Sequence, residues 1–173
     1  DRVGLEPTLN ALGQDVKDVA VAVIDSGGPT PNSEAWNESN LIDGGYDFVY
    51  GYSNSVDYLA TSNYTGNKTS HGTHVSTTIA AKNNGSFING YAVKALNINV
   101  FDVVGSGADA KTGRAASVHT TNAILYASGL SNTSGSVAPN TTPIKVINLS
   151  LGGPSYDAVQ CAAINDAIAQ GLT

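Results

Sequence analysis

Apolar residues along the chain gather in a few short runs that polar, glycine-rich segments separate. The segment 18–25, DVAVAVID, is apolar almost throughout and ends at SGGPTP. A continuous apolar run of this length is typical of a strand buried on both faces, as in a parallel sheet. Further strands are predicted in GGYDFVYG (44–51), LNINVFDVV (96–104) and IKVINLSLGG (144–153).

Helical patterns lie between these predicted strands. Ser70 can cap a helix over 71–82, which ends at NNG. Helices are also predicted over 115–128 and 156–171, and the second of these has apolar residues three and four positions apart. Strands that alternate with helices predict an α/β fold with a parallel sheet, and 173 residues are enough for one domain with a core.

Composition and charge exclude some classes of function. The hydrophobic fraction of 41% and the charged fraction of 13% are globular values. With a net charge of -6 and a pI of about 4.7, the chain is not expected to bind nucleic acid through electrostatic attraction. No apolar run approaches the roughly eighteen residues that span a bilayer, so no membrane partner is expected.

The sequence also bears on localisation. It opens on DRVGLEPTLN, which has no apolar signal-peptide core, so an exported protein would be represented here by a mature or clipped form. Asn-X-Ser/Thr sequons favour a secreted, extracellular glycoprotein, although a bacterial exoprotein rich in Asn, Ser and Thr would show the same pattern. The sequons begin at Asn37, Asn63, Asn67, Asn84, Asn132, Asn140 and Asn148.

Two residues carry the candidate chemistry. Asp25 comes just past the first buried strand, and His71 lies in the first turn of the helix that follows the polar loop 50–70. Active sites of parallel sheets form outside the carboxyl ends of the strands, where a carboxylate either caps the next element or takes part in catalysis. A carboxylate bonded to one imidazole nitrogen fixes the tautomer of the ring. Asp and His together would form two-thirds of an acyl-transfer triad.

The blocks VAVIDSGG, SHGTHVSTTIAA, GSG and VINLSLGG occur in that order along the chain. In this order and context they resemble the subtilisin-like serine proteases, the subtilases. The resemblance implies a three-layer α/β/α fold with a mainly parallel central sheet. It also implies a serine endopeptidase that acts on peptide or protein substrates through an Asp-His-Ser triad.

The resemblance assigns roles to particular residues. Asp25 matches the triad aspartate and His71 the general base, and the second histidine of the motif, His74, is expected to be a buried structural partner. His119 matches nothing in the family and is expected on the surface of its helix. The segment that pairs with the substrate backbone matches Gly105, Ser106 and Gly107. The opposing strand, which also forms one wall of the specificity pocket, matches Ser150, Leu151 and Gly152.

A structural Ca²⁺ site is also implied by the resemblance. The loop KNNGSFING follows the histidine helix with the length of the family's calcium loop. It would use carbonyl and side-chain oxygens, the ligands that Ca²⁺ prefers. The implied ligands are the carbonyls of Lys82, Ser86 and Ile88, the side chain of Asn84, and Glu34, where the family has an aspartate. A glycan on Asn84 would exclude metal binding there.

Two of the chain's departures from the family bear on the site. Ser76 and Thr77 replace the usual Ala-Gly, which implies a shifted helix or a small neighbour. The 173 residues also hold neither the family's Gly-Thr-Ser-x-Ala-x-Pro block, which carries the nucleophile, nor its Ala-Gly-Asn turn, which carries the oxyanion asparagine.

These absences shape the functional expectation. Residues 1–173 are expected to form the N-terminal part of a single peptidase domain, inactive alone and partnered by the C-terminal part of that domain. The alternatives are a non-catalytic relative, either a pseudoprotease or a peptide-binding module, and an acyl transferase or peptide cyclase built on the same triad.

Overall fold

A parallel four-stranded sheet runs through the part of the chain that the computed structural model describes, which is residues 19–53, 71–82, 84, 90, 93–102, 114–153 and 156–173. Its strands are β1 (Ala20–Asp25), β2 (Tyr46–Asp47), β3 (Lys94–Asn99) and β4 (Val146–Asn148), in the order β2-β3-β1-β4. β1 pairs with β3 along its full length and with β4 on its other side. The strand that ends in Asp25 therefore lies inside the sheet.

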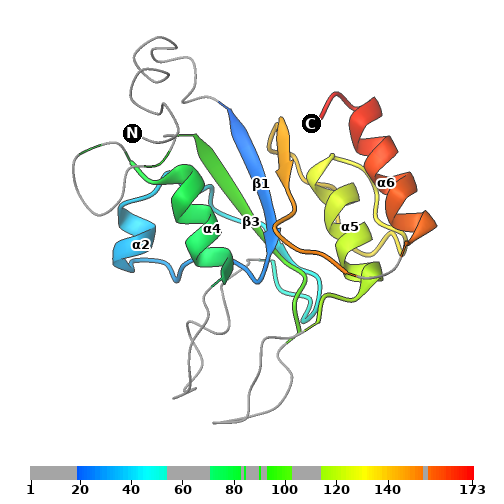
Figure 1. Ribbon diagram of the computed structural model, residues 1–173, viewed down its shortest axis with the longest axis horizontal. Coiled ribbons are helices and arrows are strands. Elements are labelled where there is room, and N and C mark those ends of the chain that lie inside the picture. Colours follow the sequence, from blue (N-terminus) through cyan, green and yellow to red (C-terminus); the bar gives the residue numbers. More distant parts are fainter. Residues whose placement is uncertain are drawn as a thin grey trace.

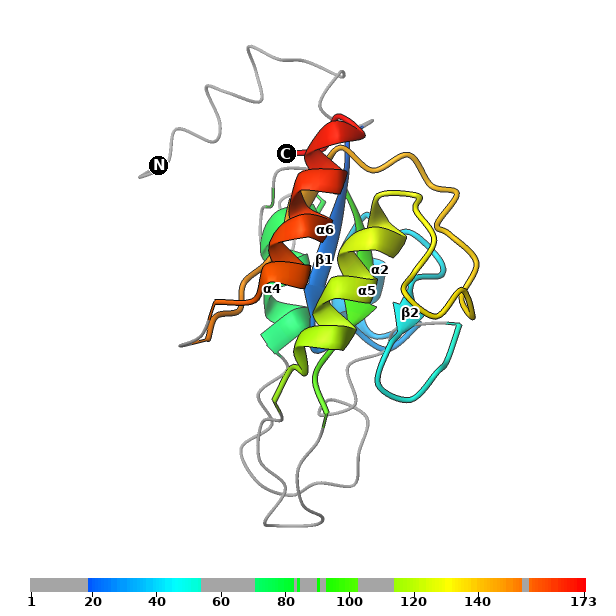
Figure 2. The ribbon, with the colours of Figure 1, turned by 90° about the vertical axis from the view of Figure 1, so that its right-hand side faces the viewer.

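Helices cover both faces of this sheet. The helices α2 (Glu34–Asn37) and α4 (His71–Ala80) lie on one side, and α5 (Ser117–Ala127) and α6 (Ala158–Ala169) pack side by side on the other (Figures 1 and 2). This arrangement confirms the predicted three-layer α/β/α fold with a parallel sheet. Among the described residues, no helix combines the length and the apolar character needed to cross a membrane.

The alternating side chains of β1 form the middle of two cores. Ala20, Ala22 and Ile24 pack in the cluster under α5 and α6, whereas Val21 and Val23 pack in the cluster on the α4 side. All six residues of β1 are buried, which explains the continuous apolar run in its sequence. Each large aliphatic side chain buried in this way stabilises the fold by about 1.5–3 kcal/mol.

Three predicted strands differ in length from the structure. In place of the predicted strand 96–104, β3 begins two residues earlier and ends at Asn99. β2 is limited to two residues because Asp47 starts a turn: its Oδ1 accepts hydrogen bonds from the backbone N–H groups of Val49 and Tyr50, both at 2.8 Å. β4 covers only three residues of the predicted strand 144–153. The side chain of Asp47 redirects the backbone in a way that a pattern of apolar residues does not reveal.

The region before and after α4 also differs from the prediction. The short helix α2 was not predicted; the Ser33 hydroxyl caps it by accepting a 3.2 Å hydrogen bond from the N–H of Trp36. α4 ends at Ala80, two residues early, because the chain leaves the helix to pair with the segment after α2. There, Lys82 N donates to Glu38 O at 2.9 Å. The predicted cap Ser70 lies outside the described residues.

Candidate active site

Asp25 and His71 meet at the carboxyl edge of the sheet. Asp25 is the last residue of β1 and His71 is the first residue of α4. The imidazole Nδ1 lies 2.8 Å from Oδ1 and 2.9 Å from Oδ2 of the carboxylate. The chain thus brings together two side chains that are 46 positions apart in the sequence.

The two side chains differ in their access to solvent. The side chain of Asp25 is 1% exposed, whereas that of His71 is 49% exposed. An ionised carboxylate against Nδ1 keeps the ring proton there and leaves Nε2, on the far side of the ring, as the hydrogen-bond acceptor. A half-exposed imidazole with a buried carboxylate against Nδ1 is the arrangement of a general base.

The residues that follow Asp25 position both partners. The backbone N–H of Ser26 donates a 2.7 Å hydrogen bond to Asp25 Oδ1, and its hydroxyl accepts a 2.9 Å bond from the N–H of Gly72. Gly72 lies so close to the loop after β1 that a Cβ on it would stand 2.0 Å from the carbonyl oxygen of Gly27. The glycine after His71 therefore lets α4 approach the end of β1 closely enough for the Asp–His contact.

We expect Gly72→Ala to destabilise the protein and to separate Asp25 from His71. Alanine is favoured over glycine in a helix by about 1 kcal/mol. The backbone must move, however, to relieve the contact between the new Cβ and Gly27. Overpacking of this kind typically costs about 1–3 kcal/mol or more. The change is measured as a shift in the urea midpoint. Gly153→Ala is the matched control, because a Cβ there meets nothing within 4 Å. Equal midpoints for the two variants would contradict the prediction.

The predicted substrate strand reaches the same edge of the sheet. Asn148 is paired with Val23, so Ser150 and Asp25 each lie two residues further along neighbouring parallel strands. Ser150 and Gly152 are exposed and Leu151 is half-buried. The opposing segment, Gly105, Ser106 and Gly107, lies outside the described residues.

The expectation for His74 is wrong. Its side chain is exposed, because the buried face of α4 consists of Gly72, Ser76, Thr77 and Ala80. Thr77 fits that face without an unsatisfied hydroxyl, since its Oγ1 donates to Thr73 O at 2.9 Å and lies 3.1 Å from His74 O.

His119, the third histidine, lies in the first turn of α5 and is half-buried rather than fully on the surface. Its Nδ1 is enclosed and has no hydrogen-bond partner among the described residues.

A second buried carboxylate lies at this edge, and the sequence analysis did not single it out. Asp47 is completely buried and accepts a 3.0 Å hydrogen bond from the amide of Asn99 through Oδ2, in addition to its two backbone donors. Three donors satisfy this carboxylate within the protein. Its role is therefore to hold the turn after β2.

Of the residues predicted to bind calcium, Asn84 contacts a carboxylate other than the predicted one. The amide nitrogen of Asn84 donates to Glu38 Oε2 at 2.8 Å, so the carboxylate beside Asn84 belongs to Glu38 and not to Glu34. Glu34 is exposed in the first turn of α2, one helical turn before Glu38. The Lys82 ammonium donates to Asn37 O at 2.5 Å. Ser86 and Ile88 lie outside the described residues.

Comparison with known proteins extends this picture. The model of the subtilase family matches residues 16–173. Subtilisin E of Bacillus subtilis (strain 168) is 29% identical over 168 residues, which cover 96% of this chain and 35% of that protein. An extracellular protease of Xanthomonas campestris pv. campestris is 34% identical over 175 residues, covering 88% of this chain and 28% of that protein.

A solved structure has the same fold. The crystal structure of a cold adapted subtilisin-like serine proteinase aligns with a TM-score of 0.55 and 21% identity, over 93% of this chain and 46% of that one. The chain thus spans about a third of the length of Subtilisin E and about half of the solved proteinase. Because the family model matches nearly all of its residues and the Asp25–His71 pair lies where the family's motifs lead one to expect it, the chain belongs to the subtilase family.

Proposed function

We propose that the complete protein of which this chain forms part is a secreted serine endopeptidase of the subtilisin type. The observation that carries this proposal is the contact between the buried Asp25 carboxylate and Nδ1 of the half-exposed His71. Family membership supports the reaction class, and the extracellular protease among the relatives supports secretion.

In this proposal His71 acts as the general base. Its Nε2 takes the proton of a serine hydroxyl while the serine oxygen attacks the carbonyl carbon of the peptide bond. Asp25 stabilises the imidazolium that forms, and the ring returns the proton to the amine as the peptide C–N bond breaks. A water molecule, deprotonated by the same imidazole, then attacks the acyl-serine, and the proton returns to the serine oxygen as the acid product leaves. This is the known mechanism of the subtilisin triad, applied here to Asp25 and His71. The serine and the oxyanion donor would come from a segment outside these 173 residues, so the chain alone is proposed to be inactive.

The proposed substrate is an extended peptide or protein segment. It would lie between 105–107 and 150–152 and form backbone hydrogen bonds with both, which holds the scissile carbonyl near His71. The exposure of Ser150 and Gly152 at the same edge as Asp25 supports this placement.

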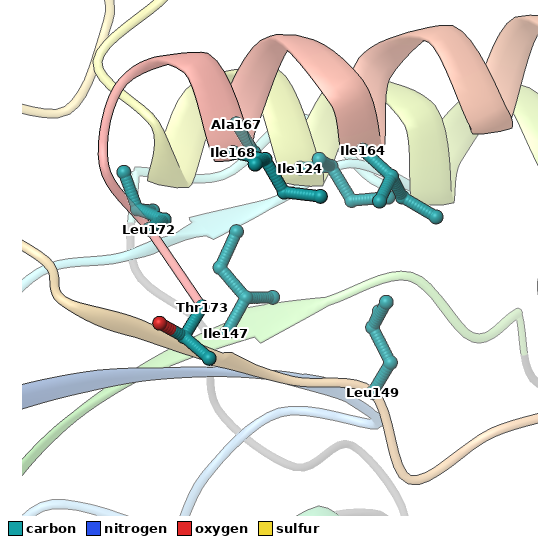
Figure 3. Close-up of a pocket in the computed structure, with 8 residues that line it drawn as sticks. All are labelled: Ile124, Ile147, Leu149, Ile164, Ala167, Ile168, Leu172 and Thr173. Atoms are coloured by element: carbon teal, nitrogen blue, oxygen red, sulfur yellow. The ribbon is translucent and has the colours of Figure 1, made fainter.

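The partner that completes the domain is proposed to add a strand beside β4. The support is that Thr173 is hydrogen-bonded beside β4 as in a parallel ladder. Thr173 N donates to Lys145 O at 3.1 Å, and Ile147 N donates to Thr173 O at 2.9 Å. Thr173 also borders an apolar cavity of about 430 Å³, into which Ile147 and Leu149 point toward the helices (Figure 3). A polypeptide segment that extends the sheet here would cover these side chains.

The test is hydrolysis of a chromogenic peptide by the complete protein, with and without a serine-directed phosphonate. We expect turnover that the phosphonate abolishes. A complete protein without turnover that still binds peptides would favour the alternative, a non-catalytic peptide-binding relative. Turnover that resists the phosphonate would contradict the serine mechanism.

We also propose a structural Ca²⁺ held by the loop after α4, with Glu38 in place of Glu34 as its carboxylate. The carboxylate of Glu38, the side-chain oxygen of Asn84 and the carbonyl of Lys82 are hard oxygen donors on neighbouring segments, and the Asn84–Glu38 hydrogen bond brings two of them together. The ion would join this loop to the segment after α2.

Removal of Ca²⁺ is expected to lower the melting temperature of the complete protein. An ion bound only by the folded state stabilises it by about 2.7 kcal/mol at a hundred times its dissociation constant. The measurement is thermal unfolding with excess EDTA and with added Ca²⁺. Glu38→Gln should remove the difference between the two conditions, whereas the control Glu34→Gln should retain it. A melting temperature that does not respond to EDTA in the wild type would refute the site.

Glycosylation is proposed at Asn37 and not at Asn132. Asn37 is exposed at the end of α2, and the 3.3 Å hydrogen bond that its Nδ2 donates to Asn32 O lies on the surface, where a glycan meets no packed loop. Asn132 is 7% exposed, and its side chain donates to Val137 O at 3.2 Å and accepts from Ser136 N at 3.2 Å, so a glycan on its nitrogen would displace the loop. Site-resolved mass spectrometry of protein secreted by a eukaryotic host should find Asn37 occupied and Asn132 free. A glycan on Asn132 in folded protein would show this assignment to be wrong.

A further inference from the structure

A buried polar pair joins the histidine helix to the sheet. Ser76 on α4 is completely buried and Asn97 on β3 is 4% exposed, and their side chains are hydrogen-bonded to each other. Asn97 is opposite Val23 of β1 in the sheet, two residues before the level of Asp25. Both polar side chains lie where the surrounding core is formed by apolar residues such as Val23 and Ala80.

The pair is connected directly to the residue after His71. The hydroxyl oxygen of Ser76 lies 2.6 Å from the carbonyl oxygen of Gly72, while the N–H of Gly72 is bonded to the hydroxyl of Ser26. The single proton of the Ser76 hydroxyl is shared between two acceptors, Gly72 O and Asn97 Oδ1. The backbone of Gly72 thus meets the end of β1 at its N–H and the Ser76–Asn97 pair at its carbonyl.

Asn97 is also held by the loop that follows Asp25. A Cβ added to Gly28 would lie 2.3 Å from the Asn97 amide nitrogen, so the amide fills the space between this loop and α4. Its side chain thus contacts both the loop after the strand of the carboxylate and the helix of the imidazole.

The chemistry of the pair argues for a role other than stability. A hydroxyl that bonds back to the carbonyl four residues earlier slightly destabilises a helix, and a buried amide costs free energy unless it is hydrogen-bonded. Two apolar groups of the same shape could replace such a pair with little loss.

We propose that Ser76 and Asn97 are positioning residues that hold His71 in register with Asp25. This role rests on the proposed function for its effect on catalysis, but not for its effect on the Asp25–His71 hydrogen bond. The relevant property is the orientation of the imidazole, because small misplacement of a catalytic group lowers the rate of the chemical step more than the binding of substrate.

The experiment compares Ser76→Ala, Asn97→Leu and the double variant in the complete protein. Thr78→Ala is the matched control: the Thr78 hydroxyl bonds back to His74 O at 2.8 Å on the same helix, but on its exposed face. Three quantities are measured: the urea midpoint, the NMR signal of the His71 Nδ1 proton in protein with ¹⁵N-labelled histidine, and kcat and KM.

Ser76→Ala is expected to lower kcat about tenfold with little change in KM, and to speed solvent exchange of the Nδ1 proton. The double variant should regain most of the urea midpoint, because no polar group is left unpaired, yet its Nδ1 proton should still exchange faster than in the wild type. Thr78→Ala should leave the Nδ1 proton and kcat unchanged.

Two results would overturn the role in positioning. One is a double variant in which the urea midpoint, the Nδ1 proton signal and kcat all return to wild-type values, since the pair would then serve stability alone. The other is an unchanged Nδ1 proton in Ser76→Ala. The NMR readout needs no turnover, so a complete protein that proves inactive would refute the proposed protease function while the proton signal still decides the role of Ser76 and Asn97.

Discussion

Replacing His71 by alanine in the complete protein is expected to lower kcat by about 10⁶-fold. Loss of the general base has an effect of this size in subtilisin itself, a member of the same family. Without the imidazole, no group takes the proton of the attacking hydroxyl, and the Asp25 carboxylate loses its partner at 2.8 Å. KM should change little, because the half-exposed ring contributes to the chemical step rather than to binding.

The matched control for this substitution is His74→Ala. His74 lies in the same helix and the same sequence motif, only three residues later, but its side chain is exposed. We expect His74→Ala to retain wild-type kcat and a wild-type urea midpoint. The rates are measured as initial velocities on a chromogenic peptide at several concentrations. If both variants lose activity equally, the motif acts through its fold and His71 is not the base.

The parts of the fold that follow from local pattern could be predicted. The apolar run of β1 predicted a strand with both faces covered, and Val23 and Ile24 are indeed completely buried on opposite sides of the sheet. Parallel pairing then places Asp25 at an edge where a helix start can meet it. The spacing of His71 and Gly72 could be interpreted only through the family resemblance, and the close contact with Gly27 explains the glycine physically.

The remaining differences arise from contacts between distant segments. Asn97 is one of two asparagines in β3, and only the packing of α4 on β3 shows that it bonds to Ser76. Glu38, and not Glu34, lies beside Asn84 because the chain pairs 38–40 with 80–82, a register that no local pattern encodes. His74 was expected inside because the motif was interpreted without the direction of each side chain around the helix.

Replacing Asp25 by asparagine is expected to lower kcat by about 10⁴-fold while the fold and KM are largely retained. The asparagine amide has nearly the same shape as the carboxylate, and its oxygen can still accept the 2.7 Å hydrogen bond from Ser26 N. If that oxygen is so engaged, the amide NH₂ takes the place of Oδ2, 2.9 Å from Nδ1 of His71. A donor there favours the tautomer with the ring proton on Nε2, so that the nitrogen that should accept the serine proton already carries one.

The control Asp47→Asn shows whether the loss of kcat in Asp25→Asn comes from the histidine tautomer or merely from removing a buried charge. Asp47 is as fully buried as Asp25 and lies at the same edge of the sheet, but it accepts hydrogen bonds from Val49, Tyr50 and Asn99 instead of facing a histidine. We expect this control to lower the urea midpoint, because its new amide meets the Asn99 amide donor, and to leave kcat within a small factor of the wild type.

The tautomer of His71 provides a readout that does not depend on turnover. In the wild type near neutral pH, the ¹⁵N shifts of the ring should report a proton on Nδ1, and in Asp25→Asn they should report one on Nε2. A loss of activity with the proton still on Nδ1 would mean that Asp25 acts by stabilising the imidazolium charge alone. Equal losses of kcat in Asp25→Asn and Asp47→Asn would mean that catalysis depends on the integrity of the sheet edge, and that the Asp25–His71 pair has no special part in it.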